Sequence, residues 1–505
     1  MSPAESIRRI VVVGGGTAGW ITAGVLAARF PNRGPEGVSV SLIESRAQPP
    51  IGVGEGTWPT IRATLQQIGV TETDFLRECD ASFKQGSRFV GWVNGDGADA
   101  YYHPFTLPVD YIERNLAPYW LEGPRSTSFA HSLCFQTRLC DHSLAPKQIT
   151  TPEFAGLANY AYHLDAGKFV PFLQKHCINK LQVTHILDEI VEVVPDGAGA
   201  ISALRTKSGT SLAGDLFIDC SGFAALLIGK HLGVPFVSAR DSLFIDKALA
   251  VQVPYPTEEA PIGSVTVSSA RSAGWIWDIG LTTRRGVGYV YSSAHSTEAE
   301  AEAQLRSYLG AEPAFRAINI NSGYRREFWV GNCVAVGLSA GFLEPLEASA
   351  IVMIELAAKS IAELLPGFRS GLPQAARLFN EVFQHRWRRI VEFLKLHYVL
   401  SKRTEPFWID NRQGSTLLEH WRQHSPWHED FSHREEVFSA ASFQYVLYGM
   451  GFEPEPMPWL LNDADRNRAR EKMAETARHG ESLRASLPTN RELLGRIRKY
   501  GLQKI

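Results

Sequence analysis

Short apolar runs alternate with a helical pattern in the first 45 residues of the chain. The run from Ile10 to Val13 has the length and composition of a buried parallel strand. A helical stretch from Ala18 to Phe30 follows and ends at Pro31, and Val38 to Glu44 reads as the next strand. This order predicts a βαβ unit.

Two later segments each look like a strand that runs into a glycine turn. Leu216 to Gly222 reads LFIDCSG, and Cys333 to Gly341 reads CVAVGLSAG. Such turns let the backbone approach a bound ligand, although either segment could be a plain strand end. The second leads into an apolar helix from about Ala348 to Leu365, which Pro366-Gly367 stops.

The chain from about Phe368 onward is rich in Arg, Trp and Glu at helical spacing. We therefore expect one module over residues 1–367, which binds the cofactor and carries the catalytic residues. A mainly helical region over residues 368–505 is expected to complete the substrate site. The charged stretch from Asp463 to Arg484 is most simply a solvated helix face. The alternative is a surface on which a partner docks.

Three glycines follow the first strand in the spacing GxGxxG. Gly14, Gly16 and Gly19 allow a tight turn and bring a pyrophosphate close to a helix N-terminus, which begins near Thr17 and Ala18. Glu44 ends the second strand 25 residues after Gly19, where an acid holds ribose hydroxyls. Strand, glycines, helix, strand and acid together predict a dinucleotide site, but do not separate FAD from NAD.

Composition narrows the class of protein. The 505 residues are 44% hydrophobic with a formal net charge of −2, which gives no basic field for nucleic acid or an anionic membrane. The first residues have neither the pattern of a signal peptide nor that of a membrane span. The six cysteines lack metal-ligand spacing, so we expect reduced thiols, no metal and a cytoplasmic protein.

Several motifs occur in an order that identifies a family. They are GGGTAGW, GVGEGTWPTI, ASFKQG, YHPF, FIDCSGF, GWIWDIG and GFLEPLEASAI, and LKLHYVLSKRTEPFW extends the match toward residue 450 and beyond. The chain resembles a flavin-dependent halogenase of the tryptophan halogenase type. The resemblance implies an α/β fold of the FAD-binding, glutathione-reductase-like kind, with mixed sheets and a helical C-terminal region.

The resemblance also implies a chemistry. Reduced FAD reacts with O2 to give a flavin hydroperoxide, a bromide or chloride ion attacks it, and the hypohalous acid formed halogenates an electron-rich aromatic ring. Lys84 matches the catalytic lysine, whose ammonium can hydrogen-bond hypohalous acid or be halogenated itself. Glu347 matches the partner glutamate, which can orient that species or take the ring proton. Without the resemblance, Lys84 is a solvated lysine and Glu347 a carboxylate in a helix's first turn.

Further roles come from the same resemblance. Gly54, Gly337 and Leu338 join the cofactor-binding set. Trp275 and Trp277 match a wall between flavin and substrate, although alternating tryptophans in a strand are often core aromatics. His103 and Phe105 match positions that flank the substrate, although a histidine beside proline is equally a turn residue.

Two departures concern the turn after the wall and the halide. Gly280 stands where the wall motif has proline. Ala348-Ser349-Ala350 stands where the family usually has Ser-Thr-Gly, and the backbone N–H groups of Ser349 and Ala350 remain available to a halide. Loss of that glycine leads to the hypothesis that bromide is preferred.

A third departure concerns the substrate. Phe443-Gln444 lies where tryptophan halogenases tend to carry two tyrosines that clamp the amino-acid part of tryptophan. We therefore expect indole or another small aromatic, with Phe443 as a candidate contact.

Two other functions stay open at this point. One is a flavin-dependent aromatic monooxygenase, which has no need of Lys84, Glu347 or the tryptophan wall. The other is a non-catalytic flavin-binding protein. Because no site for NAD(P)H is evident, a separate NAD(P)H-dependent flavin reductase is the expected partner, and the chain is expected to be a monomer or homodimer.

Overall fold

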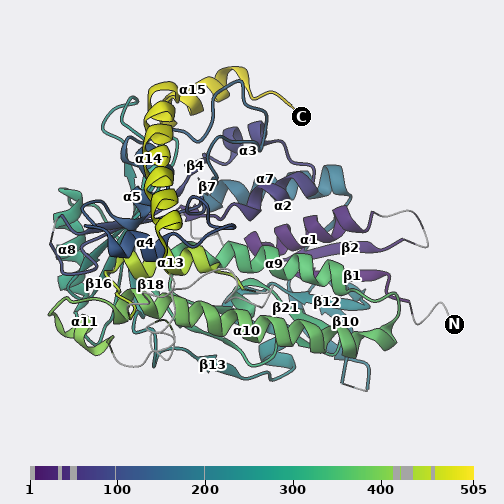
Figure 1. The fold of residues 1–505 in the computed structure, drawn as a ribbon. Helices are drawn as coiled ribbons and strands as arrows, with labels where there is room; N and C mark the ends of the chain where they lie inside the picture. The colour runs from purple at the N-terminus through teal and green to yellow at the C-terminus, as the bar shows by residue number, and fades with distance from the viewer. Residues whose placement is uncertain are drawn as a thin grey trace.

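The computed structural model describes residues 6–31, 34, 37–45, 54–96, 98–197, 199–412, 421, 436–455 and 461–504. Two large sheets lie side by side in the molecule, and the long helix α10 passes beneath both (Figure 1). The six-stranded sheet carries the predicted βαβ unit, and the seven-stranded sheet carries His103, Trp275 and Trp277.

The six-stranded sheet is parallel apart from one edge strand. Its order is β20 (Trp329–Val330), β21 (Cys333–Ala335), β12 (Leu216–Asp219), β1 (Arg9–Val13), β2 (Ser39–Glu44) and β8 (Thr184–Leu187). Helix α1 (Thr17–Arg29) connects β1 to β2 and packs against α7 (Ala166–Leu181) and α9 (Ser349–Leu364). The predicted βαβ unit is confirmed, with boundaries within one residue of those expected.

The seven-stranded sheet is antiparallel except where β15 and β5 run parallel. Its order is β18 (Arg316–Asn319), β14 (Lys247–Pro254), β17 (Arg284–Tyr291), β16 (Gly274–Gly280), β15 (Thr266–Arg271), β5 (Gly86–Val90) and β6 (Ala100–Pro104). Strand β16 holds both wall tryptophans, and β6 holds His103, which therefore lies in a strand and not in a turn.

Three small sheets complete the β-structure. The first is β11 (Ser211–Ala213), β10 (Ile201–Thr206) and β9 (Ile190–Pro195), and the second is β13 (Phe236–Ser238), β19 (Gly323–Arg325) and β22 (Gly341–Phe342). The third places β7 (Ala161–Leu164) between β3 (Glu55–Gly56) and β4 (Ser82–Lys84), so His163 pairs with Gly56 on one side and Ser82 on the other.

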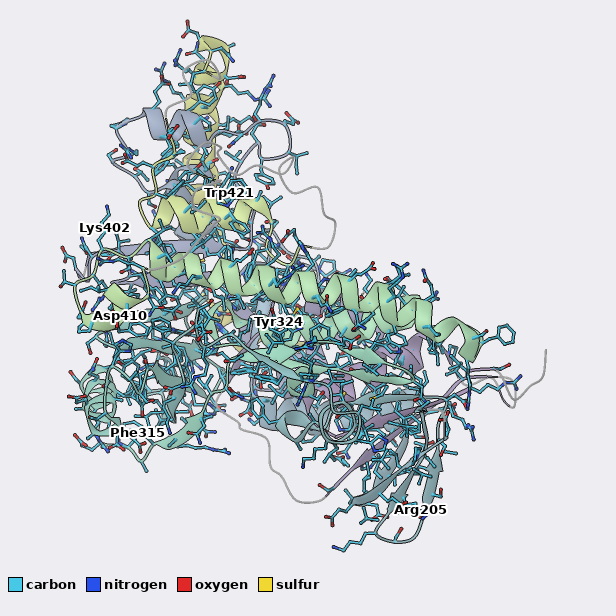
Figure 2. The ribbon with its side chains drawn as sticks, turned by 90° about the horizontal axis from the view of Figure 1, so that it is seen from below. Arg205, Phe315, Tyr324, Lys402, Asp410 and Trp421 are labelled. Carbon is cyan, nitrogen blue, oxygen red and sulfur yellow. The ribbon has the colours of Figure 1, made fainter. Side chains whose placement is uncertain are left out.

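Helices dominate the chain after residue 367, as expected. The 28-residue helix α10 (Leu372–Val399) runs across the lower face of the molecule, which faces the viewer in Figure 2. The others are α11 (Pro406–Asp410), α13 (Ala440–Gly449), α14 (Asp463–Ser486) and α15 (Asn490–Tyr500). Helix α13 packs on β6, α14 packs on α5 and α6, and α15 packs on α3. The C-terminal helices therefore pack on elements from the first third of the chain.

The remaining helices are each shorter than α1. They are α2 (Thr60–Gln67), α3 (Glu72–Glu78), α4 (Ala117–Glu122), α5 (Phe129–Leu133), α6 (Gln136–Asp141) and α8 (Glu298–Leu309), with single turns at Gly222–Ala224, Leu226–His231, Gly337–Ser339, Leu346–Ala348 and Arg369–Gly371. The α/β fold with mixed sheets and a helical C-terminal region is confirmed, whereas the domain boundary at 367/368 stays a prediction.

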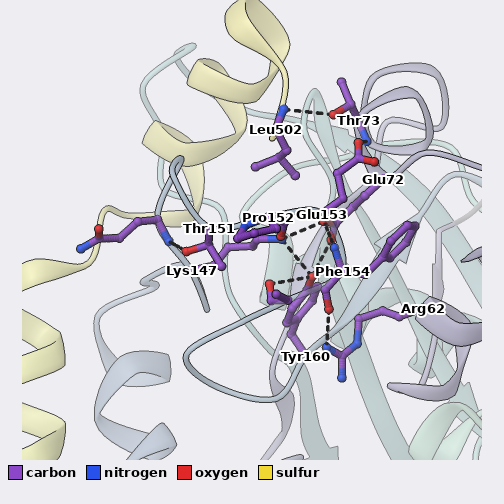
Figure 3. Close-up of polar contacts among 12 residues, drawn as sticks. Arg62, Glu72, Thr73, Lys147, Thr151, Pro152, Glu153, Phe154, Tyr160 and Leu502 are labelled. Carbon is purple, nitrogen blue, oxygen red and sulfur yellow. Dashed lines mark hydrogen bonds and ion pairs between the residues drawn. The ribbon is translucent and has the colours of Figure 1, made fainter. Parts of the chain in front are cut away.

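A buried ion pair anchors the loop that follows α6. Lys147 Nζ lies 2.8 Å from Glu72 Oε2, both side chains are fully buried, and Tyr160 and Tyr162 donate to Glu72 Oε1 at 2.7 and 2.6 Å. Phe154 N donates to Glu72 as well, while Leu502 N donates to Thr73 Oγ1 (Figure 3). The loop is thereby tied both to α3 and to the C-terminal residues.

All six cysteines are buried and unpaired. Within the described residues, no helix is long and apolar enough to cross a membrane, and no cluster of side chains has the makings of a metal site.

Candidate functional site

The glycine loop after β1 leaves an open space at the start of α1. A Cβ at Gly14, where φ is +112°, would lie 2.2 Å from Cys220 O, and one at Gly19 would lie 1.8 Å from Gly14 O. A Cβ at Gly16 would meet nothing within 4 Å, and Gly16 caps α1 without any side-chain hydrogen bond. The first amides of α1, including that of Thr17, thus face a space suited to a pyrophosphate.

Glu44 lies over this loop. A Cβ at Gly15 would meet Glu44 Oε2 at 1.7 Å, so the carboxylate covers the glycine. His185 of β8 contacts the other oxygen, with Nε2 2.8 Å from Oε1. Because one oxygen is held and the other faces the loop, the carboxylate is oriented for ribose hydroxyls.

Gly337 and Leu338 of the candidate cofactor set lie beside the start of α1, whereas Gly54 lies against the seven-stranded sheet. Gly337 has φ of +74°, and a Cβ there would lie 2.6 Å from Ala18 Cβ, so this second turn packs against the start of α1. Leu338 beside it is 37% exposed. Gly54, with φ of +92°, lies against Ile279 of the wall strand.

Lys84 ends β4 in the interior of the molecule. The side chain is buried, Nζ lies 5.4 Å from the centre of the Phe105 ring, and within the described part of the chain Nζ makes no hydrogen bond or ion pair. Burial lowers the Lys84 pKa to about 8, although the charge of Glu347 opposes that shift. A buried ammonium that makes no hydrogen bond or ion pair to a described residue is rare, which distinguishes Lys84 from an ordinary surface lysine.

Glu347 lies just before α9, outside its first turn. Glu347 and Ala348 have φ of +63° and +54°, a left-handed conformation that non-glycine residues seldom adopt. The indole N–H of Trp58 donates to Glu347 O at 2.8 Å and holds this turn. The two left-handed residues direct the Glu347 side chain to the seven-stranded sheet, so the alternative of a first-turn helix carboxylate is wrong.

Two histidines contact the buried carboxylate. His103 Nδ1 lies 2.7 Å and His397 Nε2 3.5 Å from Glu347 Oε1, and Ser87 Oγ lies 3.4 Å from Oε2. Burial alone would raise the Glu347 pKa, but the charge and hydrogen bond of His103, together with the nearby His397, outweigh burial and hold that pKa well below its usual range. Glu347 is therefore an ionised carboxylate in the interior.

Sequence reasoning missed His397, which lies on α10 and is fully buried. Tyr101 Oη lies 2.6 Å from His397 Nδ1. Because burial raises the pKa of Tyr101, its hydroxyl is the donor, which leaves the imidazole proton on Nε2 facing Glu347. The family motif LKLHYVLSKRTEPFW contains His397 and was the signal in the sequence that could have identified it.

Three polar residues form a row across the sheet below Glu347 and Lys84. Strand pairing places His103 opposite Ser87 and Ser87 opposite Thr266. Facing partners on adjacent strands share one side of a sheet, so the row presents three side chains to the site. The first two contact Glu347, and Thr266 Oγ1 lies 2.9 Å from His163 Nε2.

Trp275 and Trp277 share one face of β16, as their spacing requires. Trp275 donates from Nε1 to Tyr398 Oη at 3.0 Å and is almost fully buried. Trp277 packs against Gly288, where a Cβ would come within 2.1 Å of the indole. Glycine at position 288 thus lets the larger ring pack close to the backbone.

Gly280 ends the wall strand in a crowded place. A Cβ there would lie 3.1 Å from Tyr255 Oη, and Gly280 O accepts a hydrogen bond from Ser82 at 2.5 Å. The glycine is therefore packed tightly, and the strand still presents both tryptophans on one face.

A second buried acid, Glu344, was also missed. Tyr398 donates to Glu344 Oε1, while Glu344 Oε2 has no hydrogen-bond partner among the described residues. Burial raises its pKa to about 7. Neighbouring residues on α10, His397 and Tyr398, thus contact Glu347 and Glu344 respectively.

The segment carrying Phe105 is fixed by backbone contacts. Asn159 Nδ2 donates to Phe105 O at 2.9 Å, and Gln136 Oε1 accepts from Thr106 N at 2.8 Å. Arg62 donates to Asn159 Oδ1 and to Phe154 O, which connects this segment to the ion-pair cluster in Figure 3.

Phe443 lies one ring away from the candidate site. The side chain is fully buried, and its ring centroid lies 4.9 Å from that of Phe393. The ring centroid of Phe393 lies 6.0 Å from that of His103. Tyr445, which sequence reasoning did not select, lies 6.1 Å from His103 and donates to Thr106 O at 2.8 Å. The first turn of α9 carries Ser349, which is buried, and Ala350, which is exposed.

Known proteins resemble this chain over nearly its whole length. Residues 9–466 match the family described as Tryptophan halogenase. A tryptophan 6-halogenase of Streptomyces albogriseolus is 33% identical, covering 97% of this chain and 98% of its own, and a tryptophan 7-halogenase of Lentzea aerocolonigenes is 32% identical, covering 81% and 79%.

Solved structures of flavin-dependent halogenases have the same fold as this chain. The tryptophan halogenase of Shewanella frigidimarina NCIMB 400 has a TM-score of 0.96 at 45% identity and covers 99% of both chains. A flavin-dependent halogenase of Brevundimonas sp. BAL3 has a TM-score of 0.85 at 32% identity and covers 97% of this chain and 99% of its own.

Proposed function

The chain belongs to the tryptophan halogenase family of flavin-dependent enzymes, and from that premise we propose that it is an FADH2-dependent halogenase of small electron-rich aromatics such as indole. It forms hypohalous acid from a halide and O2 and transfers the halogen to an aromatic carbon.

One observation carries this proposal. A buried ammonium at Lys84 and a buried, ionised carboxylate at Glu347 lie close enough for the charge of Glu347 to act on Lys84. Burying two charges costs free energy unless they pair with each other or with other groups, and no ion pair joins Lys84 to any described residue. A functional role is the reason to keep such a lysine in the interior. The pair is suited to binding a neutral oxidant and removing a proton.

Each charge has a role in the transfer. The aromatic carbon attacks the halogen of HO–X, so a carbon–halogen bond forms and the oxygen–halogen bond breaks. Lys84 gives a proton to the departing oxygen, which leaves as water, and Glu347 takes the proton from the ring carbon. A proton passing from Glu347 to Lys84 restores the starting state.

The cofactor residues fit FAD. Open space at Gly16, the free amides at the start of α1 and the oriented Glu44 carboxylate match the pyrophosphate and ribose of a dinucleotide. Reduced FAD, when bound, supplies with O2 the oxidising equivalent that turns the halide into hypohalous acid. A separate NAD(P)H-dependent flavin reductase delivers the reduced cofactor.

Trp275 and Trp277 keep the aromatic substrate apart from the flavin in this proposal. Both lie on the face of β16 that packs into the main core, and Gly54 of the cofactor set contacts the same strand. Without such a wall the substrate would be oxygenated, which is the outcome expected of the monooxygenase alternative.

The halide and substrate preferences follow from local sequence. The amides of Ser349 and Ala350 at the start of α9 bind the halide, with bromide preferred. Phe105 and His103 contact the aromatic ring. Indole is favoured over free tryptophan because Phe443 and Gln444 supply no pair of tyrosines for an amino-acid group.

Product analysis tests the proposal. The purified chain, a flavin reductase, FAD, NADH and bromide are incubated with indole or tryptophan, and products are examined by mass spectrometry. We expect a bromine isotope pair on indole, lost in Lys84→Met and retained in Lys395→Met, a second buried lysine whose pKa burial also lowers to about 8. An oxygenated product would support the monooxygenase, and equal rates with both halides or both substrates would contradict the stated preferences.

A further inference from the structure

Three different chemical groups converge on one point beside Gly56. A Cβ built on Gly56 would lie 3.0 Å from Lys84 Nζ, 3.4 Å from Ala348 Cβ and 3.6 Å from Thr266 Oγ1. An ammonium, a methyl group and a hydroxyl therefore line the same point. Of these three nearest atoms, Thr266 supplies the hydroxyl.

The Thr266 hydroxyl is held in place by His163. His163 Nε2 lies 2.9 Å from Thr266 Oγ1, and the imidazole is fully buried. Burial, and then the charge of Lys84, hold the His163 pKa well below its usual value, so the ring is neutral. In the neutral tautomer with its proton on Nδ1, Nε2 accepts from the Thr266 hydroxyl, and a lone pair of Oγ1 is left to accept another bond.

Packing alone does not account for His163. Its Nδ1 is buried without a hydrogen-bond partner among the described residues, which costs stability. Strand pairing places His163 opposite both Gly56 and Ser82, so one residue of β7 fixes the position of Gly56 and of the strand that carries Lys84. Thr266 also continues the row of His103 and Ser87, whose other members contact Glu347.

We propose that Thr266 and Lys84 together hold hypohalous acid above Gly56, with His163 as the positioning residue for Thr266. The oxygen of HO–X accepts from the Lys84 ammonium, and its O–H donates to Thr266 Oγ1, so the oxidant is held at two points with its halogen free for the aromatic carbon. This inference rests on the proposed function and names a further residue that binds the reacting species.

The matched variants Thr266→Val and Thr266→Ser test the role of the hydroxyl. Valine keeps the shape and removes the hydrogen bond, whereas serine keeps the hydroxyl. Two quantities are measured: halogenated indole per FADH2 oxidised, and free hypohalous acid captured by a soluble β-diketone. We expect Thr266→Val to lower product per FADH2 by about tenfold, because one hydrogen bond to hypohalous acid is lost. The amount of captured hypohalous acid should rise accordingly. Thr266→Ser should stay near the wild type.

Gly56→Ala tests the point on which Lys84 and Thr266 converge. The added methyl would occupy the point between Nζ and Oγ1, and the Gly56 backbone is not in the left-handed region. We expect loss of product with FAD affinity and thermal midpoint unchanged. Full product formation by Gly56→Ala, or wild-type coupling in Thr266→Val, would overturn the inference.

His163→Leu separates positioning from direct binding. It should reproduce the rise in captured hypohalous acid, and the double variant with Thr266→Val should be no worse than either single variant, because both remove the same contact. Additive losses would contradict the role of His163. If the wild type yields neither halogenated product nor captured hypohalous acid, the proposed function fails; if it yields product and the variants match it, only this inference fails.

Discussion

Nδ1 of His103 lies 2.7 Å from Oε1 of Glu347, within the interior of the protein. One residue comes from the edge strand β6 and the other from a left-handed turn before α9. Their contact keeps the carboxylate charged where water is excluded, so Glu347 is prepared to accept a proton before any substrate arrives.

Glu347→Gln should slow halogenation sharply. The amide keeps the size of the side chain but cannot accept a proton, so we expect a loss of about 10² to 10⁴-fold in the rate of product formation. Rates are compared under saturating FADH2, with FAD affinity as the control for folding. A variant that keeps the wild-type rate would show that another group removes the ring proton.

The reaction should depend on the ionisation of Lys84. Burial lowers the Lys84 pKa to about 8, so the ammonium is present below that pH and is lost as the pH rises through it. Since the ammonium donates to hypohalous acid, the single-turnover rate should fall above about pH 8. Flavin oxidation is followed in the same samples as the control. A rate that increases through pH 8 would instead indicate that the neutral amine is the species halogenated.

The buried pair of Lys147 and Glu72 should control stability. Lys147→Met leaves the Glu72 carboxylate buried and unpaired, which should lower the free energy of unfolding by about 3–5 kcal/mol. Urea denaturation followed by tryptophan fluorescence measures the loss. Adding Glu72→Gln to Lys147→Met removes the stranded charge and should recover part of it; no recovery would contradict a cost that arises from charge.

Gly14→Ala and Gly16→Ala should have different effects although they lie two residues apart. Alanine at 14 needs a left-handed conformation and would collide with Cys220 O, so the thermal midpoint should fall. Alanine at 16 meets no protein atom, so stability should be unchanged while FAD affinity drops by tenfold or more. Fluorescence titration with FAD measures affinity, and unaltered binding by Gly16→Ala would place the pyrophosphate elsewhere.

Local pattern in the sequence was sufficient for the nucleotide-binding unit. β1, α1, β2 and the glycines between them are consecutive, so apolar period and turn residues specify them directly. Helix α9 was likewise expected because an apolar run ends at Pro366-Gly367. Lys84 and Glu347 came from the family resemblance, since neither residue type nor spacing marks a buried charge.

The contacts around Glu347 could not be read from local pattern. His397 reaches the carboxylate from α10, and Thr266 joins the row of His103 and Ser87 only through the parallel pairing of β15 with β5. Thr266 and Ser87 are 179 positions apart and His397 and Glu347 are 50 positions apart, and a single sequence does not encode such contacts in any short-range signal. The left-handed turn at Glu347 was missed for a related reason, because its sequence contains no glycine.

The most direct test of the account is to ask where hypohalous acid goes when Lys84 is removed. Wild type and Lys84→Met are each given pre-reduced FAD, bromide, indole and the soluble β-diketone, and both brominated products are quantified by mass spectrometry. The account predicts that Lys84→Met oxidises FADH2 and brominates the diketone but not indole. Bromoindole at the wild-type yield and regiochemistry from Lys84→Met would contradict it.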